Sequence, residues 1–159
     1  MTAKGFTLIE LVVVIVILSI LAVAATSRFI NLREDATTAS WSGVVGSFRS
    51  GLGLVLSQHK VEGEPEILEV NGFDLSFHDT HVSPPEVRDY PVALTNGHCT
   101  IVWNALVSGV VAKEPGADVI LGENEVIAEA NGQVAGQCIY ESLLGSVTYQ
   151  SGSGEVEVQ

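Results

Sequence analysis

The chain is poor in basic residues. Of its 159 residues, 7 are Lys or Arg and 19 are Asp or Glu, so the formal net charge is −12 at pH 7. The basic residues after Asn31 form no stripe or cluster, and a surface of this sign repels phosphate backbones. The sequence therefore predicts that the isolated chain does not bind nucleic acid. The same charge favours solubility and discourages unspecific association.

Cysteine is equally scarce. Cys99 and Cys138 are the two in the chain, and their spacing fits neither a CxxC redox motif nor a four-ligand zinc site. If the folded part of the chain lies outside the cytoplasm, one disulfide between them is expected, whereas two buried free thiols are the alternative. The disulfide would close a loop of roughly 40 residues and stabilise the fold by about 3–4 kcal/mol in the chain-entropy model.

The motifs of common catalytic and metal sites are also missing. The sequence has no phosphate-binding loop and no nucleophile elbow. Residues 78–81 offer two imidazoles and one carboxylate without a third ligand at a fixed spacing, and the acidic cluster at residues 118 and 123–125 lacks EF-hand spacing. Both are interpreted as exposed polar segments, and Trp41 and Trp103 as core or interface residues. We therefore predict no enzymatic activity, no metal site and no cofactor.

A long apolar run near the N-terminus is what the chain has in excess. Hydrophobic residues make up 47% of the sequence and the mean hydropathy is +0.36, yet residues 11–25 contain no charge and only one polar residue, Ser19. The stretch from Leu8 to Ala25 is long enough to cross a hydrocarbon core of about 30 Å as a helix. Lys4 before this stretch and acidic residues after it predict a cytoplasmic N-terminus and a folded part outside the membrane.

Glu10 does not fit a plain membrane anchor. A carboxylate at the edge of an apolar helix is costly and usually functional. Either Glu10 reaches the headgroup region, or it pairs with a positive group. A free amino group on a neighbouring subunit would be such a group, if the chain were cut just before Phe6.

The residues from Lys4 to Glu10, Lys-Gly-Phe-Thr-Leu-Ile-Glu, followed by the aliphatic run, resemble the class III signal of type IV pilins and of type II secretion pseudopilins. The resemblance implies that a membrane prepilin peptidase cuts after Gly5 and methylates Phe6. It also implies that Glu10 neutralises the terminal amine of an adjacent subunit during assembly. We accordingly expect a leader peptide at residues 1–5, a transmembrane and assembly helix at residues 6–30, and a globular periplasmic or extracellular head at residues 31–159.

Helical spacing continues beyond the apolar run and predicts one long helix to about Ser57, with glycines that let another element approach closely. Residues 60–69 are expected to form a loop, and Asn71-Gly72 and residues 83–85 to form turns. Residues 96–99 are expected to form a turn that enters a strand, and residues 99–103 to form a strand or a short helix. Further strands are expected at residues 117–121, 125–129, 138–141 and 146–149, with an edge strand at 155–158. The predicted fold class is α+β and type IV pilin-like, with the long N-terminal helix packed on a small antiparallel sheet.

Short segments at residues 15–18 and 28–32, and a cysteine four residues before Trp103, resemble the mannose-sensitive haemagglutinin (MSHA) branch of type IV pilins. This resemblance implies a structural pilus subunit that supports surface attachment and cell adhesion. The implied partners are identical or related pilin subunits in a helical homopolymer, the prepilin peptidase and the inner-membrane assembly machinery. The chain would span the bacterial inner membrane once before assembly and lie in a cell-surface pilus afterwards.

Three alternatives remain open at this point. The chain could be a pseudopilin of a type II secretion system, a minor pilin of the same pilus, or an anchored periplasmic binding domain. The binding domain leaves Gly5, Phe6 and Glu10 unexplained together. The two cysteines favour a pilin, because major pseudopilins often lack such a pair and use calcium instead.

Overall fold

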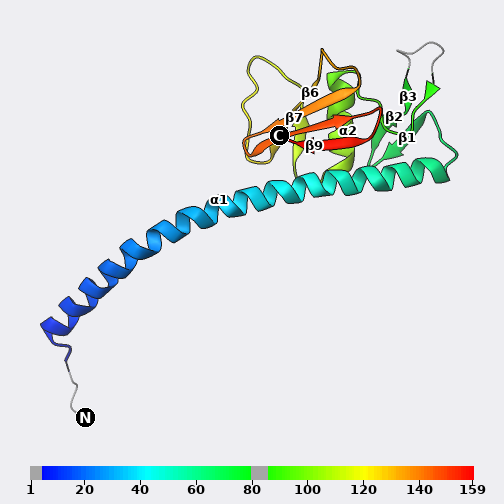
Figure 1. The fold of residues 1–159 in the computed structure, drawn as a ribbon. Helices are drawn as coiled ribbons and strands as arrows, with labels where there is room; N and C mark the ends of the chain where they lie inside the picture. Colours follow the sequence, from blue (N-terminus) through cyan, green and yellow to red (C-terminus); the bar gives the residue numbers. More distant parts are fainter. Residues whose placement is uncertain (1–4, 80–85) are drawn as a thin grey trace. The chain divides into compact units, whose positions relative to one another are not determined.

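The computed structural model describes residues 5–79 and 86–159, and they form two compact units, Met1–Ala39 and Ser40–Gln159. Helix α1 (Leu8–Val61) contributes to both units (Figure 1). Residues 1–4 of the expected leader, His81 and the expected turn at residues 83–85 lie outside the described residues.

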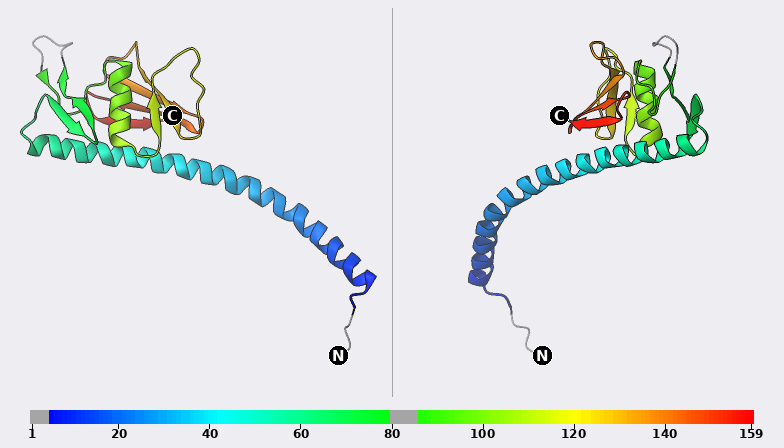
Figure 2. Two further views of the ribbon diagram at one scale, coloured as in Figure 1. Left: turned by 180° about the vertical axis from the view of Figure 1, so that it is seen from behind. Right: turned by 45° about the vertical axis from the view of Figure 1, so that its right-hand side comes forward.

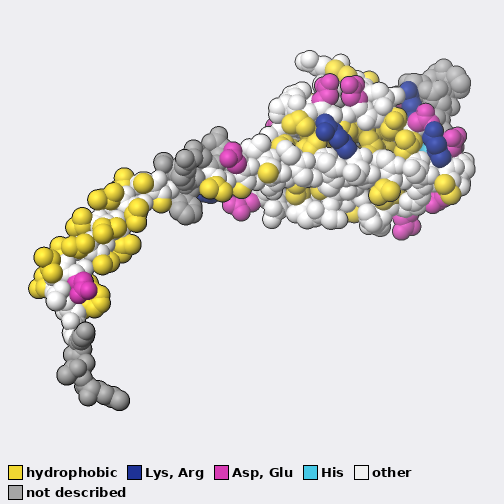
Figure 3. All heavy atoms as spheres, turned by 60° about the horizontal axis from the view of Figure 1, so that its bottom comes forward, with side chains coloured by type: hydrophobic (Ala, Val, Ile, Leu, Met, Phe, Trp, Pro, Cys, Tyr) yellow, Lys and Arg dark blue, Asp and Glu magenta, His cyan; other side chains and the backbone are white. Residues whose placement is uncertain are grey.

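The first unit contains the apolar run as a helix. A span of 19 residues, Leu8–Thr26, has a mean hydropathy of 3.1 and no buried residue, so it is long and apolar enough to cross a membrane. Apolar side chains cover this part of the helix (Figure 3). The hydroxyls of Ser19 and Thr26 donate to the carbonyl oxygens of Ile15 and Ala22, at 2.7 and 2.9 Å. The helix therefore satisfies these polar groups by itself, as lipid requires.

Within the second unit, α1 buries one face. The buried side chains recur at helical spacing and belong to Trp41, Val45, Phe48, Leu52 and Val55. The helix ends at Val61, one turn after the predicted end at Ser57.

Of the four glycines in this part of α1, Gly51 is the one that another segment of the chain approaches closely. A Cβ atom on Gly51 would lie 3.0 Å from the carbonyl oxygen of Leu106, whereas nothing lies within 4 Å of that position at Gly43, Gly46 or Gly53. The prediction for the glycines is therefore confirmed at Gly51 and wrong at the other three.

Two short antiparallel pairs follow α1. Strands β1 (Ile67–Val70) and β2 (Phe73–Ser76) form a hairpin, and β3 (His78–Asp79) pairs with β4 (Glu86–Val87). The turn at Asn71-Gly72 is confirmed, with φ angles of 52° and 82° that suit a two-residue hairpin of type I′. The predicted loop at residues 60–69 is wrong at both ends, because α1 continues to Val61 and because pairing with β2 extends the chain from Ile67.

The main sheet has five strands in the order β5-β6-β7-β8-β9. The strands are β5 (Val111–Lys113), β6 (Glu125–Ala130), β7 (Gln137–Ser142), β8 (Gly145–Gln150) and β9 (Glu155–Val158). Strands β6 to β9 are antiparallel, and β5 is parallel to β6. The α+β class is confirmed, with a mixed sheet in place of a wholly antiparallel one.

The four predicted strands that became β6 to β9 are confirmed, and the one at residues 117–121 is wrong. Ile120 is 87% exposed, so this apolar segment has no buried face to hold it in the sheet. The place beside β6 is taken by β5 instead.

Helix α2 (Asn96–Leu106) contacts β5 and β6 of the main sheet and β2 of the first hairpin (Figure 2). Thr95 is its N-cap, and the Thr95 hydroxyl accepts a hydrogen bond from the backbone N–H of His98 at 3.1 Å. The prediction of a turn at residues 96–99 leading into a strand is wrong, because Thr95 caps a helix that begins at Asn96, three residues before the apolar stretch. The short-helix alternative for residues 99–103 is the correct one.

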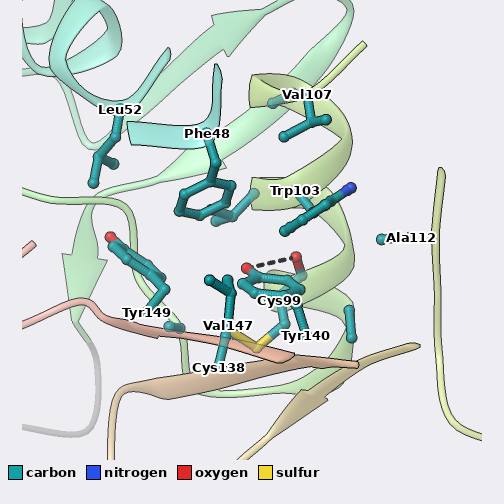
Figure 4. Packing of buried hydrophobic residues seen from close by; sticks show 14 of the residues in the cluster. Phe48, Leu52, Cys99, Trp103, Val107, Ala112, Cys138, Tyr140, Val147 and Tyr149 are labelled. Atoms are coloured by element: carbon teal, nitrogen blue, oxygen red, sulfur yellow. Dashed lines mark hydrogen bonds between the residues drawn. A yellow bond between two sulfur atoms is a disulfide. The ribbon is translucent and has the colours of Figure 1, made fainter. Parts of the chain in front are cut away.

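An aromatic cluster fills the space between α1, α2 and the sheet (Figure 4). The Phe48 ring centroid lies 5.3 Å from that of Trp103, 5.5 Å from that of Tyr140 and 5.8 Å from that of Tyr149. Trp41 stacks on Trp103 with centroids 6.3 Å apart. Both tryptophans are buried, which confirms that they are core residues of the head.

A disulfide joins Cys99 on α2 to Cys138 on β7, with Cα atoms 5.6 Å apart. Both cysteines are fully buried beside the aromatic cluster (Figure 4). The disulfide thus ties the helix to the sheet in the interior of the head, where neither sulfur is open to solvent.

Because two tyrosines are buried, we expect the free energy of unfolding of the head to decrease at alkaline pH. Tyr140 donates to the carbonyl oxygen of Cys99 at 3.1 Å, and Tyr149 to that of Pro91 at 2.8 Å. Burial raises the pKa of both hydroxyls well above the ordinary value. The unfolded chain therefore loses these protons first, and stability falls above about pH 10, by up to about 1.4 kcal/mol per pH unit for each tyrosine.

Tyr140→Phe tests this expectation in urea denaturation between pH 7 and pH 12. The variant is expected to lose about 1 kcal/mol at pH 7, where a hydrogen bond is missing, and to show a shallower decline above pH 10. If the free energy of unfolding fell equally steeply above pH 10 in the variant and the wild type, the role of the Tyr140 hydroxyl would be contradicted.

Candidate assembly site at the start of helix α1

The start of α1 is a capping box formed by Thr7 and Glu10. The Thr7 hydroxyl accepts from the backbone N–H of Glu10 at 3.3 Å. In return, Glu10 Oε2 accepts from the Thr7 hydroxyl at 3.2 Å and from the Thr7 backbone N–H at 3.4 Å. This reciprocal pattern of Thr-x-x-Glu satisfies amide groups that the first helical turn leaves without intrahelical partners.

The surroundings of this box are apolar and open. Phe6, Leu8 and Ile9 are 76%, 80% and 71% exposed, and Glu10 is exposed as well. Nothing approaches within 4 Å of the Cβ position at Gly5. One helical turn therefore presents a carboxylate four residues after Phe6, and Gly5, the residue before Phe6, is exposed.

Sequence reasoning assigned Gly5, Phe6 and Glu10 to this site but missed Thr7. The signal was available, because a Ser or Thr followed three residues later by Glu, just before an apolar run, marks the beginning of a helix. Thr7 holds the Glu10 carboxylate against the helix end, so the carboxylate has a partner even in a single copy of the chain.

Residues 1–26 match the model of the prokaryotic N-terminal methylation motif. The chain carries the prokaryotic N-terminal methylation motif. This match covers the apolar run and every residue of the capping box. It points to a structural protein, and the prediction that the chain is not an enzyme is confirmed.

The chain is also similar to the type IV narrow pilus major component PilA5 of Thermus thermophilus. The two are 43% identical over 60 residues, which is 38% of this chain and 52% of that protein. The chain thus spans about half the length of this relative. It matches no solved structure.

Outside the methylation motif, Glu125 and His78, two of the residues considered for metal binding, are engaged in other contacts. Lys113 Nζ lies 2.6 Å from Glu125 Oε1, and the Gly122 N–H donates to Glu125 Oε2 at 3.0 Å. These two contacts hold the pKa of Glu125 below its ordinary value, the Lys113 contact having the larger effect. His78 Nδ1 lies 3.9 Å from Glu66 Oε2. Among residues 5–79 and 86–159, no three His, Cys, Asp or Glu side chains are grouped as a metal site.

Proposed function

We propose that the chain is a structural subunit of a type IV pilus. The observation that carries the proposal is the methylation motif, which contains an apolar helix without a buried residue. A helix that is apolar all round is stable only in lipid or packed among similar helices. Exchange of lipid for neighbouring helices is nearly neutral in free energy per unit area, so packing and polar pairing decide between the two environments.

In this proposal, residues 1–5 are removed after Gly5, Phe6 is methylated, and residues 6–30 serve first as a membrane anchor and then as the assembly helix. Residues 31–159 form the head on the outer side of the inner membrane and then on the pilus surface. The partners are further pilin subunits, the prepilin peptidase and the inner-membrane assembly machinery. Within the type IV pilins, the MSHA branch and a role in cell adhesion are the finer proposal, supported by the segments that resemble that branch.

The Glu10 carboxylate is proposed to pair with the new amino terminus of a neighbouring subunit. A second role, as a plain helix cap, is suggested by its contacts with Thr7. Two variants separate these roles, because Thr7→Val removes the capping hydroxyl and keeps the carboxylate, whereas Glu10→Val removes the carboxylate.

Each variant is to be expressed beside the wild-type subunit, and its share in sheared surface filaments measured by mass spectrometry. Both variants should be cut after Gly5. Glu10→Val is expected to enter filaments at least about tenfold less than wild type, since a charged hydrogen bond contributes roughly 1.5–3 kcal/mol. Thr7→Val is expected to enter at nearly the wild-type level. If both variants entered filaments equally poorly, Glu10 would act only as a helix cap. If Glu10→Val entered filaments at the wild-type level, Glu10 would have no role in assembly.

Immunogold electron microscopy of intact cells, with antibody against the head, tests the pilus itself. Long labelled filaments whose subunits begin at methylated Phe6 are the expected result. Processed protein confined to the envelope would instead indicate a pseudopilin or a minor subunit. A chain that still begins at Met1 would overturn the proposal.

A further inference from the structure

The turn between β7 and β8 exposes two adjacent leucines. Leu143 is 63% exposed and Leu144 is 44% exposed. The turn is fixed from within, because the Ser142 hydroxyl donates to the carbonyl oxygen of Gly145 at 2.9 Å and accepts from the Leu144 N–H at 3.1 Å. We call residues 142–145 the leucine turn.

Packing against α1 keeps the leucine turn in place. The backbone at Gly145 packs directly against the indole ring of Trp41, because a Cβ atom on Gly145 would lie only 2.9 Å from Trp41 Nε1. The φ angle of Gly145 is 153°, which also favours glycine at this position. The two leucines are therefore held on the surface by a rigid support rather than by a loose loop.

A groove lies further along α1, between α1, α2 and the β1–β2 turn. Its volume is about 250 Å³, and its lining includes Gly51, Leu54, Val70 and Leu106. Leu54 is 73% exposed. The Asn71 side chain donates to the carbonyl oxygen of Ala105 at 2.8 Å and so joins the hairpin turn to α2 at the groove. No residue that lines the groove is charged.

Charge decides which kind of partner fits these two surfaces. Residues 40–159 contain 16 acidic and 4 basic residues and so hold the entire net charge of −12. Each of the four basic residues is engaged within the head, in the contacts Arg49–Val156, Lys60–Asp89, Arg88–Asp79 and Lys113–Glu125. Two such heads repel each other wherever their charged surfaces meet. The leucine turn and the groove are uncharged, so two copies can touch there without that penalty.

The two surfaces are separated along the helix. From Trp41 beside the turn to Leu54 in the groove, α1 advances by roughly 20 Å at about 1.5 Å per residue. A contact between different surfaces of two copies is heterologous, and it generates an open helical polymer when the rotation does not close.

We propose that the leucine turn of one head seats in the α1–α2 groove of the next copy in the filament. This inference rests on the proposed function and adds a contact between heads to the packing of the N-terminal helices. The groove is thus occupied by a second copy of this chain, whose Leu143 and Leu144 side chains enter it.

Cysteine cross-linking in sheared filaments tests the contact. The double variant Leu143→Cys with Leu54→Cys is expected to give a ladder of dimers, trimers and longer species on mild oxidation, because each copy carries both halves of the contact. Each single variant is expected to stay monomeric. Leu143→Cys with Val61→Cys is the matched control, since Val61 is 88% exposed on the same helix about two turns further on. The native disulfide is fully buried and does not interfere.

Filaments of normal appearance with no ladder, or with an equal ladder in the control pair, would overturn the inference and leave the proposed function standing. Dimers in the Leu143→Cys single variant would indicate an isologous contact and would also overturn it. Absence of filaments from wild-type cells would remove the proposed function and this contact with it.

A charge in the turn provides a second test. Leu143→Glu is expected to lower the mass of filament per cell by about tenfold with the subunit level unchanged, because the carboxylate would lose water in a groove whose lining offers it no positive charge. Leu143→Met should keep the wild-type yield. Equal filament yields from Leu143→Glu and Leu143→Met would contradict the contact.

Discussion

Replacing Cys99 and Cys138 together by alanine is expected to lower the free energy of unfolding of the head by about 4 kcal/mol. The two residues are 39 positions apart, and a cross-link over a loop of this length removes about that much loop-closure free energy from the unfolded chain. Urea denaturation of the full chain in mild detergent, followed by near-ultraviolet circular dichroism, measures the loss.

Reduction of the wild-type chain is the matched control for the disulfide. It breaks the cross-link but retains both sulfur atoms in the core, so it separates the loss of the link from the loss of packing. The reduced chain should account for most of the effect. A double alanine variant within about 1 kcal/mol of the wild type would contradict the chain-entropy account.

Phe48→Ala is expected to destabilise the head by about 4 kcal/mol, in the range found when a buried phenylalanine is truncated. Phe48 is completely buried and its ring lies within 6 Å of the rings of Trp103, Tyr140 and Tyr149. Its removal would leave a cavity where α1, α2 and the sheet meet, and aromatic pair interactions would be lost in addition.

Leu54→Ala serves as the control for Phe48→Ala on the same helix. Leu54 is 73% exposed, so its truncation should change the free energy of unfolding by no more than about 0.5 kcal/mol. The same denaturation measurement applies to both variants. Similar losses at the two positions would show that the buried face of α1 does not carry the stability of the head.

The N-terminal helix and the late strands could be predicted because their signals are local. The apolar run has the length of a membrane span, and in β6 buried residues alternate with partly exposed ones, as the sequence pattern indicates. The buried tryptophans of the core followed from residue type alone.

The errors occurred where tertiary contacts decide the local structure. The turn expected at residues 96–99 is instead the first part of α2, because Thr95 caps the helix and Trp103 is buried. Strand β1 lies in an acidic stretch and exists through its pairing with β2. The parallel pairing of β5 with β6 has no signature in a strand of three residues. At the candidate site, Thr7 was missed although its spacing from Glu10 marked it.

The small number of cations in the head, all four of them engaged within it, has a consequence for the physical behaviour of a whole pilus. Because these four cations offset only 4 of the 16 negative charges, a polymer of these heads would carry a net charge of −12 per subunit along its length. Such a polymer is a polyelectrolyte rod. Rods of like charge hold each other apart over about one Debye length, which is about 30 Å at 0.01 M ionic strength and about 8 Å at 0.15 M. The ionic strength of the surrounding water, and not a specific ligand, would then set whether neighbouring filaments stay dispersed or gather into bundles.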